Sequence, residues 1–596
     1  MANKMKAQNK LNVIDAKLLK TDGIFDSQIK LISENILKVI DMRALADYFR
    51  NKADMFATGE FWGKIMRASC MIYSYTQDAG LRKIIDDAAN DMISIQKEDG
   101  DLSTVPKEKQ PNGSCGSDLW ERKYALMGLL AYYEATGSAA ALNAARKLAL
   151  YTASQVGLPP KTPITQTGWA FCGIESSSIL EVIMRTYMYT KDKELLDFGK
   201  YIIESGACSR ENIFEAIKNG KSPYMIGNNG NPKESIAKAY EMMSCFEGLV
   251  EYYRATGDAD ALRTAVAFWD KVKEEEITLL GSGGADAPYN LGPGTGEQWN
   301  LTAKEQTNPD IELMMETCVT VYWMRLSFNL LKATGDPKYA DAIECSLYNA
   351  ILGAIRPDGG FFEYFPRFNG KRNSKVNYSF NINGFDLSCC TANGPTGLAM
   401  FTQTALMSGE EGYALNFYES LKYEDDSVRI EVISDYPAEG KAVANLLNKS
   451  DRNIVLSLRV PGWTTEFSVQ LPDREIHGTP GQYANIPCKS HSESVLKVRF
   501  SIPVVRHDAP LGSNRKGDNF EAYTYGAILL SQDDALSQLV YPLDKKLPED
   551  FKITKPDGRF FIAEATIGGK KVIFTDYMSS GKQVPDGEFM TWIPTV

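Results

Sequence analysis

The sequence predicts a mainly α-helical domain, an (α/α)6 barrel of helical hairpins, followed by C-terminal β-sandwich domains. Two observations indicate this fold class. A helix–turn–helix pattern recurs through the first two thirds of the 596 residues, and the hydrophobic period changes from 3.6 to 2 after about residue 415. The length also exceeds what one ordinary core accommodates. We expect an N-terminal strand segment at 1–30, the helical barrel at 31–415, a β-sandwich at 416–510 and a second β-rich domain at 511–596.

The helical region repeats one sequence plan. In residues 129–149, 249–269 and 326–352, an amphipathic helix ends at Ala-Thr-Gly and a second helix follows. Glycine just past a helix is the usual left-handed stop, and the Asp or Ser after it can cap the next helix. Weaker copies lie at 71–92 and 184–205. These five segments therefore predict five helical hairpins.

Two further segments complete the predicted barrel. If the helices at 32–49 and 397–407 join the five hairpins, the array closes as six pairs, which is the arrangement of an (α/α)6 toroid. An open solenoid is the alternative, but its repeats are normally more regular in length.

Alternating or β-branched runs follow the helical region and are separated by Gly, Pro, Asn and Asp turns. This pattern predicts one or two β-sandwiches, with a break near the charged loop at 511–519. The early segment 11–19 is also strand-like, and we expect it to fold back onto these strands. The runs are 427–436, 453–463, 465–471, 494–506 and 522–532.

Charge and hydropathy limit the partners of the chain. A net charge of −11 argues against a nucleic-acid or anionic-membrane surface, because such surfaces need clustered Lys and Arg. No run of about 18 apolar residues predicts a membrane span. No apolar stretch follows the basic N-terminus, so no secretory signal is predicted. We expect a cytoplasmic protein, or a periplasmic one whose leader has been removed, that binds a neutral or small partner. The sequence leaves a homodimer open.

One cysteine pair stands out in the segment FDLSCCTANGPTG. The ten cysteines are too thinly spread for a disulfide framework, and most are expected to be buried. Cys389 and Cys390 are adjacent, however, where chance predicts roughly 0.2 such pairs. The composition of residues 391–395 predicts a turn directly after the pair. The two thiols are therefore candidates for a site at the mouth of a loop.

A second motif, MMETCVTVYW, places Glu316 and Cys318 two residues apart. Residues at i and i+2 point about 200° apart on a helix, so both can share a ligand only if the segment is extended or just entering a helix. Three thiolates and one carboxylate form a tetrahedral set suited to Zn²⁺. The spacing between the motifs matches no zinc finger, so buried or unpaired cysteines are the alternative.

Together these motifs resemble glycoside hydrolase family 127, the β-L-arabinofuranosidase-like group. The similarity covers nearly the whole chain in order. It implies a catalytic helical barrel and a retaining exo-glycosidase, with a zinc ion held by one glutamate and three cysteines and the first cysteine of the pair as nucleophile. Carried over, the ligands are Glu316, Cys318, Cys389 and Cys390, and the nucleophile is Cys389. The motifs are METC before a helix, DLSCCTANGPTG, ECSLYNAILGA, GGFFEYFPRFNG and LSLRVPGW.

The resemblance also implies an acid/base residue and two sugar contacts. The acid/base glutamate of the family lies shortly before the Glu-x-Cys motif, which corresponds to Glu297 in GPGTGEQWN. Nearby thiolates would raise its pKa, as an acid at pH 7 requires; the alternative is a solvated carboxylate in a Gly-rich loop. Glu344 and Tyr364 match residues near the sugar, and their alternatives are a surface helix charge and a core aromatic.

The sugar pocket departs from the family pattern. Members that cleave arabinofuranose grip the sugar with several barrel histidines, but the three histidines of this chain, at 477, 491 and 507, all lie in the β region. Other residues of the helical region are candidates to line the pocket, although helix packing or a solvated face is the default interpretation of each. A cationic Lys123 or Arg122 would suit an acidic sugar. The candidates are Trp120, Glu121, Lys123, Trp169, Glu175 and Glu241.

We therefore expect a retaining exo-glycosidase that releases a terminal pentofuranose from plant cell-wall glycans through a zinc-bound cysteine nucleophile. The sugar is β-L-arabinofuranose or a related rare sugar, an acidic one included. Two alternatives stay open. One is a hydrolase or lyase with the same barrel that uses paired carboxylates, with zinc structural or absent. The other is a glycan-binding protein without catalysis. The candidate carboxylates are Asp118, Glu121, Glu175 and Glu241.

Overall fold

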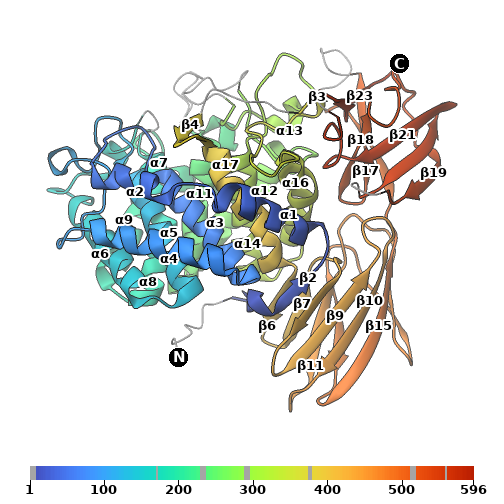
Figure 1. The fold of residues 1–596 in the computed structure, drawn as a ribbon, viewed down its shortest axis with the longest axis horizontal. Coiled ribbons are helices and arrows are strands. Elements are labelled where there is room, and N and C mark those ends of the chain that lie inside the picture. The colour runs from blue at the N-terminus through green and yellow to red at the C-terminus, as the bar shows by residue number, and fades with distance from the viewer. Residues whose placement is uncertain are drawn as a thin grey trace.

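A helical domain lies beside two β-rich regions in the structure, a computed structural model (Figure 1). This arrangement confirms the predicted fold class of a helical domain followed by β-rich domains. Among the residues that the structure describes, no helix combines the length and the apolar character needed to cross a membrane. The structure describes residues 9–169, 172–227, 237–286, 296–372, 379–510, 519–556, 560–584 and 586–596.

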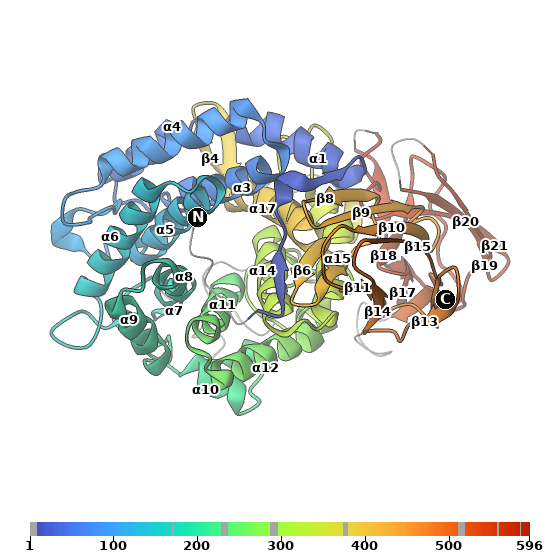
Figure 2. The same cartoon turned by 90° about the horizontal axis from the view of Figure 1, so that it is seen from below.

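Within the described residues, six helices form an inner ring. Each packs against the next, and the last returns to pack on the first, so the ring is closed and the array is not an open solenoid (Figure 2). The inner helices are α3 (Glu60–Thr76), α5 (Asp118–Thr136), α8 (Leu180–Thr190), α11 (Ala239–Thr256), α14 (Thr317–Thr334) and α17 (Cys389–Thr404).

Five inner helices are each followed by an outer helix that packs back onto them. Gly137, Gly257 and Gly335 end three inner helices with φ values of 75°, 82° and 71°, which confirms the predicted left-handed stops. Ser138 and Asp258 then cap the next helices through their side chains. These outer helices are α4 (Ala79–Ile95), α6 (Ala139–Gln155), α9 (Lys193–Glu204), α12 (Ala259–Glu275) and α15 (Lys338–Ser346).

The remaining helices cover the ring or form short turns in its loops. α1 packs on α17, and α2 packs on α3 and α4. They include α1 (Ile24–Ile32), α2 (Met42–Arg50), α7 (Ile174–Ser177), α10 (Ile213–Lys218), α13 (Thr302–Glu305), α16 (Leu352–Ala354), the π-helical segments η2 (Ser33–Leu37) and η7 (Leu347–Ile351), and the short 3-10 helices η1 (Ala16–Leu18), η3 (Lys107–Lys109), η4 (Ile164–Gln166) and η5 (Pro223–Met225).

The inner helices all run in the same direction, because each outer helix returns the chain before the next inner helix starts. Their N-terminal ends therefore gather at one end of the ring. A helix N-terminus carries exposed N–H groups and a partial positive charge, so this end favours anionic side chains. The first turns of α3, α5, α11, α14 and α17 carry the candidate site residues.

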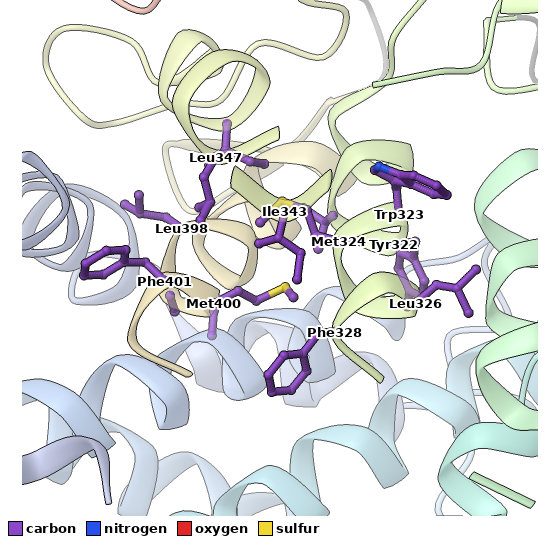
Figure 3. Close-up of a cluster of buried hydrophobic side chains, with 14 of the residues drawn as sticks. Tyr322, Trp323, Met324, Leu326, Phe328, Ile343, Leu347, Leu398, Met400 and Phe401 are labelled. Atoms are coloured by element: carbon purple, nitrogen blue, oxygen red, sulfur yellow. The ribbon is translucent and has the colours of Figure 1, made fainter. Parts of the chain in front are cut away.

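A buried apolar cluster fixes α14 and α17 relative to each other beneath these ends (Figure 3). Side chains of the two helices interlock with Ile343 of α15 and Leu347 of η7. Because protein interiors are close-packed, neither helix can shift without opening a cavity. The labelled members are Tyr322, Trp323, Met324, Leu326, Phe328, Ile343, Leu347, Leu398, Met400 and Phe401.

The middle β region consists of a five-stranded sheet, in the order β1-β6-β7-β11-β14, and a seven-stranded sheet, in the order β13-β12-β15-β10-β9-β8-β2. β1 (Leu11–Val13) pairs with β6 and β2 (Leu19–Thr21) pairs with β8, so the segment 11–19 does fold back onto this region. Their other strands are β6 (Leu406–Gly409), β7 (Gly412–Leu415), β8 (Leu421–Glu424), β9 (Val428–Ser434), β10 (Lys441–Asn448), β11 (Ile454–Arg459), β12 (Phe467–Gln470), β13 (Glu475–His477), β14 (Tyr483–Cys488) and β15 (Ser492–Phe500).

The C-terminal β region forms one larger sheet built on the order β16-β17-β18-β21-β20-β19. The helical domain contributes to it, because β3 (Asn369–Lys371) pairs with β22. The run predicted at 522–532 is two strands, separated by a turn at Gly526, whose φ is 57°. The strands are β16 (Val504–Asp508), β17 (Phe520–Tyr525), β18 (Ile528–Asp533), β19 (Glu549–Thr554), β20 (Ile562–Ile567), β21 (Lys570–Asp576), β22 (Glu588–Met590) and β23 (Ile593–Pro594).

The region boundaries differ in part from the predicted ones. The last inner helix ends at Thr404, and the strand that follows it, β6 of the middle region, begins at Leu406, which is earlier than residue 415. The predicted break at 511–519 lies, except for residue 519, outside the described residues. β16, which precedes that loop, already pairs with β17 of the C-terminal sheet.

The close approach of α3 and α5 depends on a glycine. A Cβ added to Gly63 would lie 1.9 Å from the carbonyl oxygen of Tyr124. We expect Gly63→Ala to force the helices apart and to lower the free energy of unfolding by about 1–3 kcal/mol. Calorimetry should then show a lower melting temperature. Gly360→Ala is the control, because its methyl group would meet no atom closer than 3.5 Å. Equal melting temperatures for the two variants would contradict the close approach.

Candidate active site

Glu316, Cys318, Cys389 and Cys390 lie together at the N-terminal ends of α14 and α17. Their candidate ligand atoms are all within 4.8 Å of one another. Cys390 Sγ is 3.7 Å from Cys318 Sγ and 3.9 Å from Cys389 Sγ. Glu316 Oε1 is 3.6 Å from Cys390 Sγ and 3.7 Å from Cys389 Sγ. In a tetrahedral zinc site with Zn–S bonds of about 2.3 Å, two sulfurs lie about 3.8 Å apart. The donor set and its spacing therefore fit a zinc ion.

The backbone at the start of α14 allows Glu316 and Cys318 to converge. Glu316 is extended, with φ −56° and ψ 134°, and directly precedes the helix, whereas Cys318 lies in its first turn. The segment is therefore just entering a helix, as the i, i+2 spacing of the two residues requires if they are to share a ligand. Met315, just before them, has a φ of 65°, a conformation that bulky side chains rarely adopt. Its N–H donates to the Gly284 carbonyl at 2.7 Å, which holds this strained entry into the helix.

The two adjacent cysteines open α17. Ser388 caps the helix by accepting a hydrogen bond from the Thr391 N–H at 3.0 Å, and residues 391–395 continue the helix. The turn predicted there is wrong, because the cap and the packing of Gly394 against Phe362 override the turn-forming composition; a Cβ on Gly394 would lie 2.4 Å from that ring. Thiols at a helix N-terminus ionise more easily, since its partial positive charge stabilises the thiolate.

A single segment, 362–364, joins the two helices that carry the cluster. The Thr317 N–H donates to the Tyr364 carbonyl at 2.9 Å, and the Thr317 hydroxyl donates to the Glu363 carbonyl at 2.6 Å. On the other side, the Phe362 N–H donates to the Thr391 hydroxyl at 3.4 Å. The segment therefore locks the first turns of α14 and α17 in register.

Tyr364 also connects the two predicted catalytic residues. Its hydroxyl donates to Glu297 and accepts from the Cys389 thiol, whose Sγ lies 3.0 Å away. The other carboxylate oxygen of Glu297 contacts the Lys238 ammonium, which also lies 3.7 Å from Glu241 Oε1. Of the four cluster residues, only Cys389 is not fully buried. The Gly-rich loop before Glu297 lies mostly outside the described residues.

Two charged residues of this site were missed from the sequence. Lys64 Nζ lies 3.2 Å from Glu60 Oε1 and 3.9 Å from Cys318 Sγ, and all three side chains are buried. Glu60 and Lys64 are four residues apart, which is typical of a surface ion pair on a helix. Their burial could have been predicted from the apolar neighbours in EFWGKIM, because a helix that is apolar on all sides is a buried one.

The protein's own groups favour ionisation of one sulfur over the others. Burial opposes ionisation of Cys318, but hydrogen bonds from Cys389 and Cys390 and the charge of Lys64 outweigh it and lower the pKa of Cys318 to about 6. Burial raises the pKa of the Cys389 thiol to about 12, and a hydrogen bond to Cys318 adds to this shift. A metal cation would be needed to ionise the remaining thiols near neutral pH.

Several predicted lining residues form one wall near the cluster. The Trp120 ring lies 5.7 Å from that of Trp169 and 5.5 Å from that of Tyr240, and its indole N–H donates to Glu60. Glu175 and Glu241 are fully buried. Burial raises the pKa of Glu175 to about 8 and also raises that of Glu241. Aromatic rings and carboxyl groups therefore lie together in the interior of the ring.

Other candidates are engaged in contacts within the barrel. Arg122 forms an ion pair with Asp118 at 2.6 Å, and Lys123 donates to the hydroxyls of Ser178 and Ser244 at 3.0 Å each. Glu121 accepts from Ser117 at 2.8 Å and from Thr104. These contacts explain the residues as parts of the helical packing and give no support to an acidic sugar held by Arg122 or Lys123.

Glu344 lies at a different place in the fold. Its Oε1 is 2.8 Å from Arg459 Nη2, and its Oε2 accepts from the Trp463 indole at 3.0 Å. Both partners belong to the middle β region, so Glu344 joins α15 to that region. The prediction that Glu344 contacts the sugar gains no support from these contacts.

Comparison with protein families gives two matches. A family model described as "Beta-L-arabinofuranosidase, GH127 catalytic domain" matches residues 18–403, and one described as "Beta-L-arabinofuranosidase, GH127 middle domain" matches residues 413–503. A curated relative from Bifidobacterium longum, named non-reducing end β-L-arabinofuranosidase, is 21% identical over 437 residues. That match spans 67% of this chain and 64% of the relative, less than two thirds of its length.

Solved structures show the same fold. A GH127 β-L-arabinofuranosidase from Geobacillus stearothermophilus T6 has a TM-score of 0.76 at 18% identity, covering 98% of this chain and 100% of that chain. A GH127 β-arabinofuranosidase has a TM-score of 0.76 at 17% identity, covering 99% of both chains. A third structure, described as a glycoside hydrolase, has a TM-score of 0.74 at 16% identity, with coverage of 100% and 99%.

The raised pKa of Glu175 predicts a pH-dependent difference in stability. The folded protein holds the Glu175 proton up to about pH 8, whereas the unfolded chain releases it near its ordinary pKa. Its contribution to stability is therefore complete at acidic pH and is lost as the pH rises towards 8. Glu175→Gln keeps a neutral side chain, so its melting temperature relative to wild type should rise steadily between pH 5 and 8. A difference in melting temperature between Glu175→Gln and wild type that stays constant from pH 5 to 8 would contradict the raised pKa of Glu175.

Proposed function

Because the chain belongs to glycoside hydrolase family 127, we propose that it is a retaining exo-glycosidase that releases a terminal β-L-arabinofuranose, or a related pentofuranose, with Cys389 as its nucleophile. One observation carries the proposal. Cys389 and Glu297 contact the same phenol oxygen of Tyr364, so a nucleophile and a proton donor lie on either side of one point. Retaining glycosidases need two such groups a short distance apart.

The metal of the proposed site is zinc, held by Glu316, Cys318, Cys389 and Cys390. The sulfur and oxygen spacings fit tetrahedral coordination, and Glu316 Oε2 is buried without a hydrogen-bond partner among the described residues. When bound, zinc would keep its cysteine ligands as thiolates at neutral pH. The two helix N-termini add to this effect through their partial positive charge.

The first chemical step would form a bond between Cys389 Sγ and the anomeric carbon of the sugar. The bond from that carbon to the leaving oxygen breaks, and its electron pair stays on the oxygen. Glu297 gives its proton to that oxygen, which leaves as a hydroxyl of the remaining glycan. Tyr364 orients both reacting groups, because its hydroxyl contacts each of them.

The second step would release the sugar. Glu297, now a carboxylate, takes a proton from water, and the water oxygen bonds to the anomeric carbon as the carbon–sulfur bond breaks. The proton and the thiolate are then restored to their starting groups. Two displacements at one carbon give net retention of configuration.

The wall around Trp120 and Glu175 supports a neutral sugar. An aromatic face packs against the C–H groups of a sugar ring, and a buried carboxyl group hydrogen-bonds its hydroxyls. Glu175, neutral at pH 7 because of its raised pKa, can both donate and accept. These groups would take the place of the histidines that the barrel lacks. The wider substrate would be an oligosaccharide or glycan of the plant cell wall that ends in such a sugar.

Removing the nucleophile tests the mechanism. Cys389→Ser should lower kcat by at least about a thousandfold with an aryl β-L-arabinofuranoside, because an un-ionised hydroxyl is a far weaker nucleophile than a thiolate. Cys488→Ser, which changes a buried thiol in β14, is the matched control and should keep wild-type turnover. Full turnover by Cys389→Ser would rule out this nucleophile, and mass spectrometry of a trapped covalent adduct should identify Cys389.

The proposed acid/base residue has its own signature. Glu297→Gln should lose activity about 10²–10⁴-fold with substrates whose leaving group needs a proton, and much less in the first step with an activated aryl leaving group. Glu312→Gln is the control, because Glu312 is an exposed carboxylate between Glu297 and the cysteine motif. Equal losses for both classes of leaving group would argue against proton donation by Glu297.

A further inference from the structure

The proposed metal site concentrates negative charge in the interior. Three thiolates and one carboxylate bring four negative charges, and a dication offsets two of them, so the loaded site has a net charge of −2. Cys318, Cys390 and Glu316 are fully buried. Uncompensated charge in a low-dielectric interior is costly, so the surrounding chain has to supply cations.

Lys64 is placed to supply one of these cations. Lys64 lies near the start of α3, its side chain is fully buried, and its Nζ lies 3.9 Å from Cys318 Sγ. The ammonium also lies 5.1 Å from the centre of the Tyr124 ring and 5.4 Å from that of Tyr240, which favours the charged form at this position. Glu60, 3.2 Å away, fixes its direction.

The surroundings of the sulfurs are unequal. Cys318 has the Lys64 ammonium beside it, whereas Cys389 has the neutral hydroxyl of Tyr364 at 3.0 Å. A cation next to one sulfur stabilises negative charge there and lowers the tendency of that sulfur to leave a metal or to attack carbon. Lys64 also acts on the half-buried Cys389 through its charge, but of these two sulfurs it donates a hydrogen bond only to Cys318 among the described contacts.

Building on the proposed function, we propose that Lys64 is a positioning residue of the metal centre. Its ammonium, 3.9 Å from Cys318 Sγ, holds that sulfur in place as a lasting ligand of the metal, and the asymmetry leaves Cys389 as the sulfur that reacts. Lys64 touches no reacting atom and acts through Cys318. The geometry of the four-residue cluster alone does not say which sulfur stays bound to the metal and which one reacts, and the position of Lys64 distinguishes them.

Zinc affinity tests this role without reference to turnover. In competition with a chromogenic chelator at pH 7, Lys64→Met should bind zinc about 10- to 100-fold more weakly than wild type, and Lys64→Arg should recover most of the affinity. Lys123→Met is the matched control, because Lys123 is an equally buried lysine of the inner ring whose hydrogen bonds go to two serines. It should bind zinc as wild type does.

Glu60→Gln keeps the test decisive if Lys64→Met fails to fold. This variant removes a competing negative charge but keeps an amide oxygen that can accept from Lys64 and hold its direction, so zinc binding should be unchanged or tighter. A purely structural role for the ion pair predicts weaker binding in both variants. Zinc binding by Lys64→Met equal to wild type, or a tenfold loss in Glu60→Gln, would overturn the inference and leave the proposed function intact.

Alkylation mapped by mass spectrometry reports on the individual sulfurs. Within the cluster of the zinc-loaded wild type, iodoacetamide should modify Cys389 first and spare Cys318, while the exposed Cys115 reacts outside the site. In Lys64→Met, the protection of Cys318 should be lost. Modification of Cys318 before Cys389 in the wild type would contradict the division of roles. A wild-type chain that binds no zinc would overturn the proposed metal centre, and this inference with it.

Discussion

The structure depends on placing several acidic side chains, three thiols and the carboxyl group of Glu316, together in the interior of a helical ring. Six parallel inner helices make this arrangement tolerable, because their N-termini meet at one end and bring partial positive charge to it. Cys318 and Cys389 lie in the first turns of two neighbouring helices, so no long loop is needed to bring their side chains together. Lys64 adds an ammonium group beside the Cys318 sulfur, and Lys238 adds one beside Glu297.

The rest of the fold keeps these first turns in place. The apolar cluster below the site fixes α14 against α17, and segment 362–364 ties their ends together. The same stretch of chain continues into β3, which pairs with β22, and the Asn369 amide donates to the Trp592 carbonyl at 2.7 Å. The C-terminal sheet therefore steadies the segment that carries Tyr364. Arg459 of the middle β region likewise holds the outer helix α15 in place through its ion pair with Glu344.

Local signals in the sequence predicted the architecture, and distant contacts decided what they missed. Left-handed glycines and their caps, such as Gly257 with Asp258, mark the hairpins because each depends on a few neighbouring residues. The turn predicted at 391–395 failed because the Ser388 cap and the Phe362 ring favour a helix there. The spacing of Lys64 from Glu60 gave no distinctive signal, since an i,i+4 ion pair has the same spacing on a surface helix as in a ring interior, and only the apolar neighbours of the pair pointed to burial. The cysteine cluster itself was identified through resemblance, because its two halves are far apart in the sequence.

The proposed reacting groups and the proposed sugar-binding wall come from different parts of the ring, so a change in one set need not disturb the other. The thiols and Glu316 lie on α14 and α17, whereas Trp120, Glu175 and Glu241 lie on α5, α7 and α11. A substitution in the second set would therefore change the proposed sugar contacts without moving a residue of the cysteine cluster. A barrel without histidines is therefore compatible with an intact cysteine centre. Burial, which holds Glu175 neutral near pH 7, lets a carboxyl group serve as both donor and acceptor, the two roles that a neutral imidazole also combines.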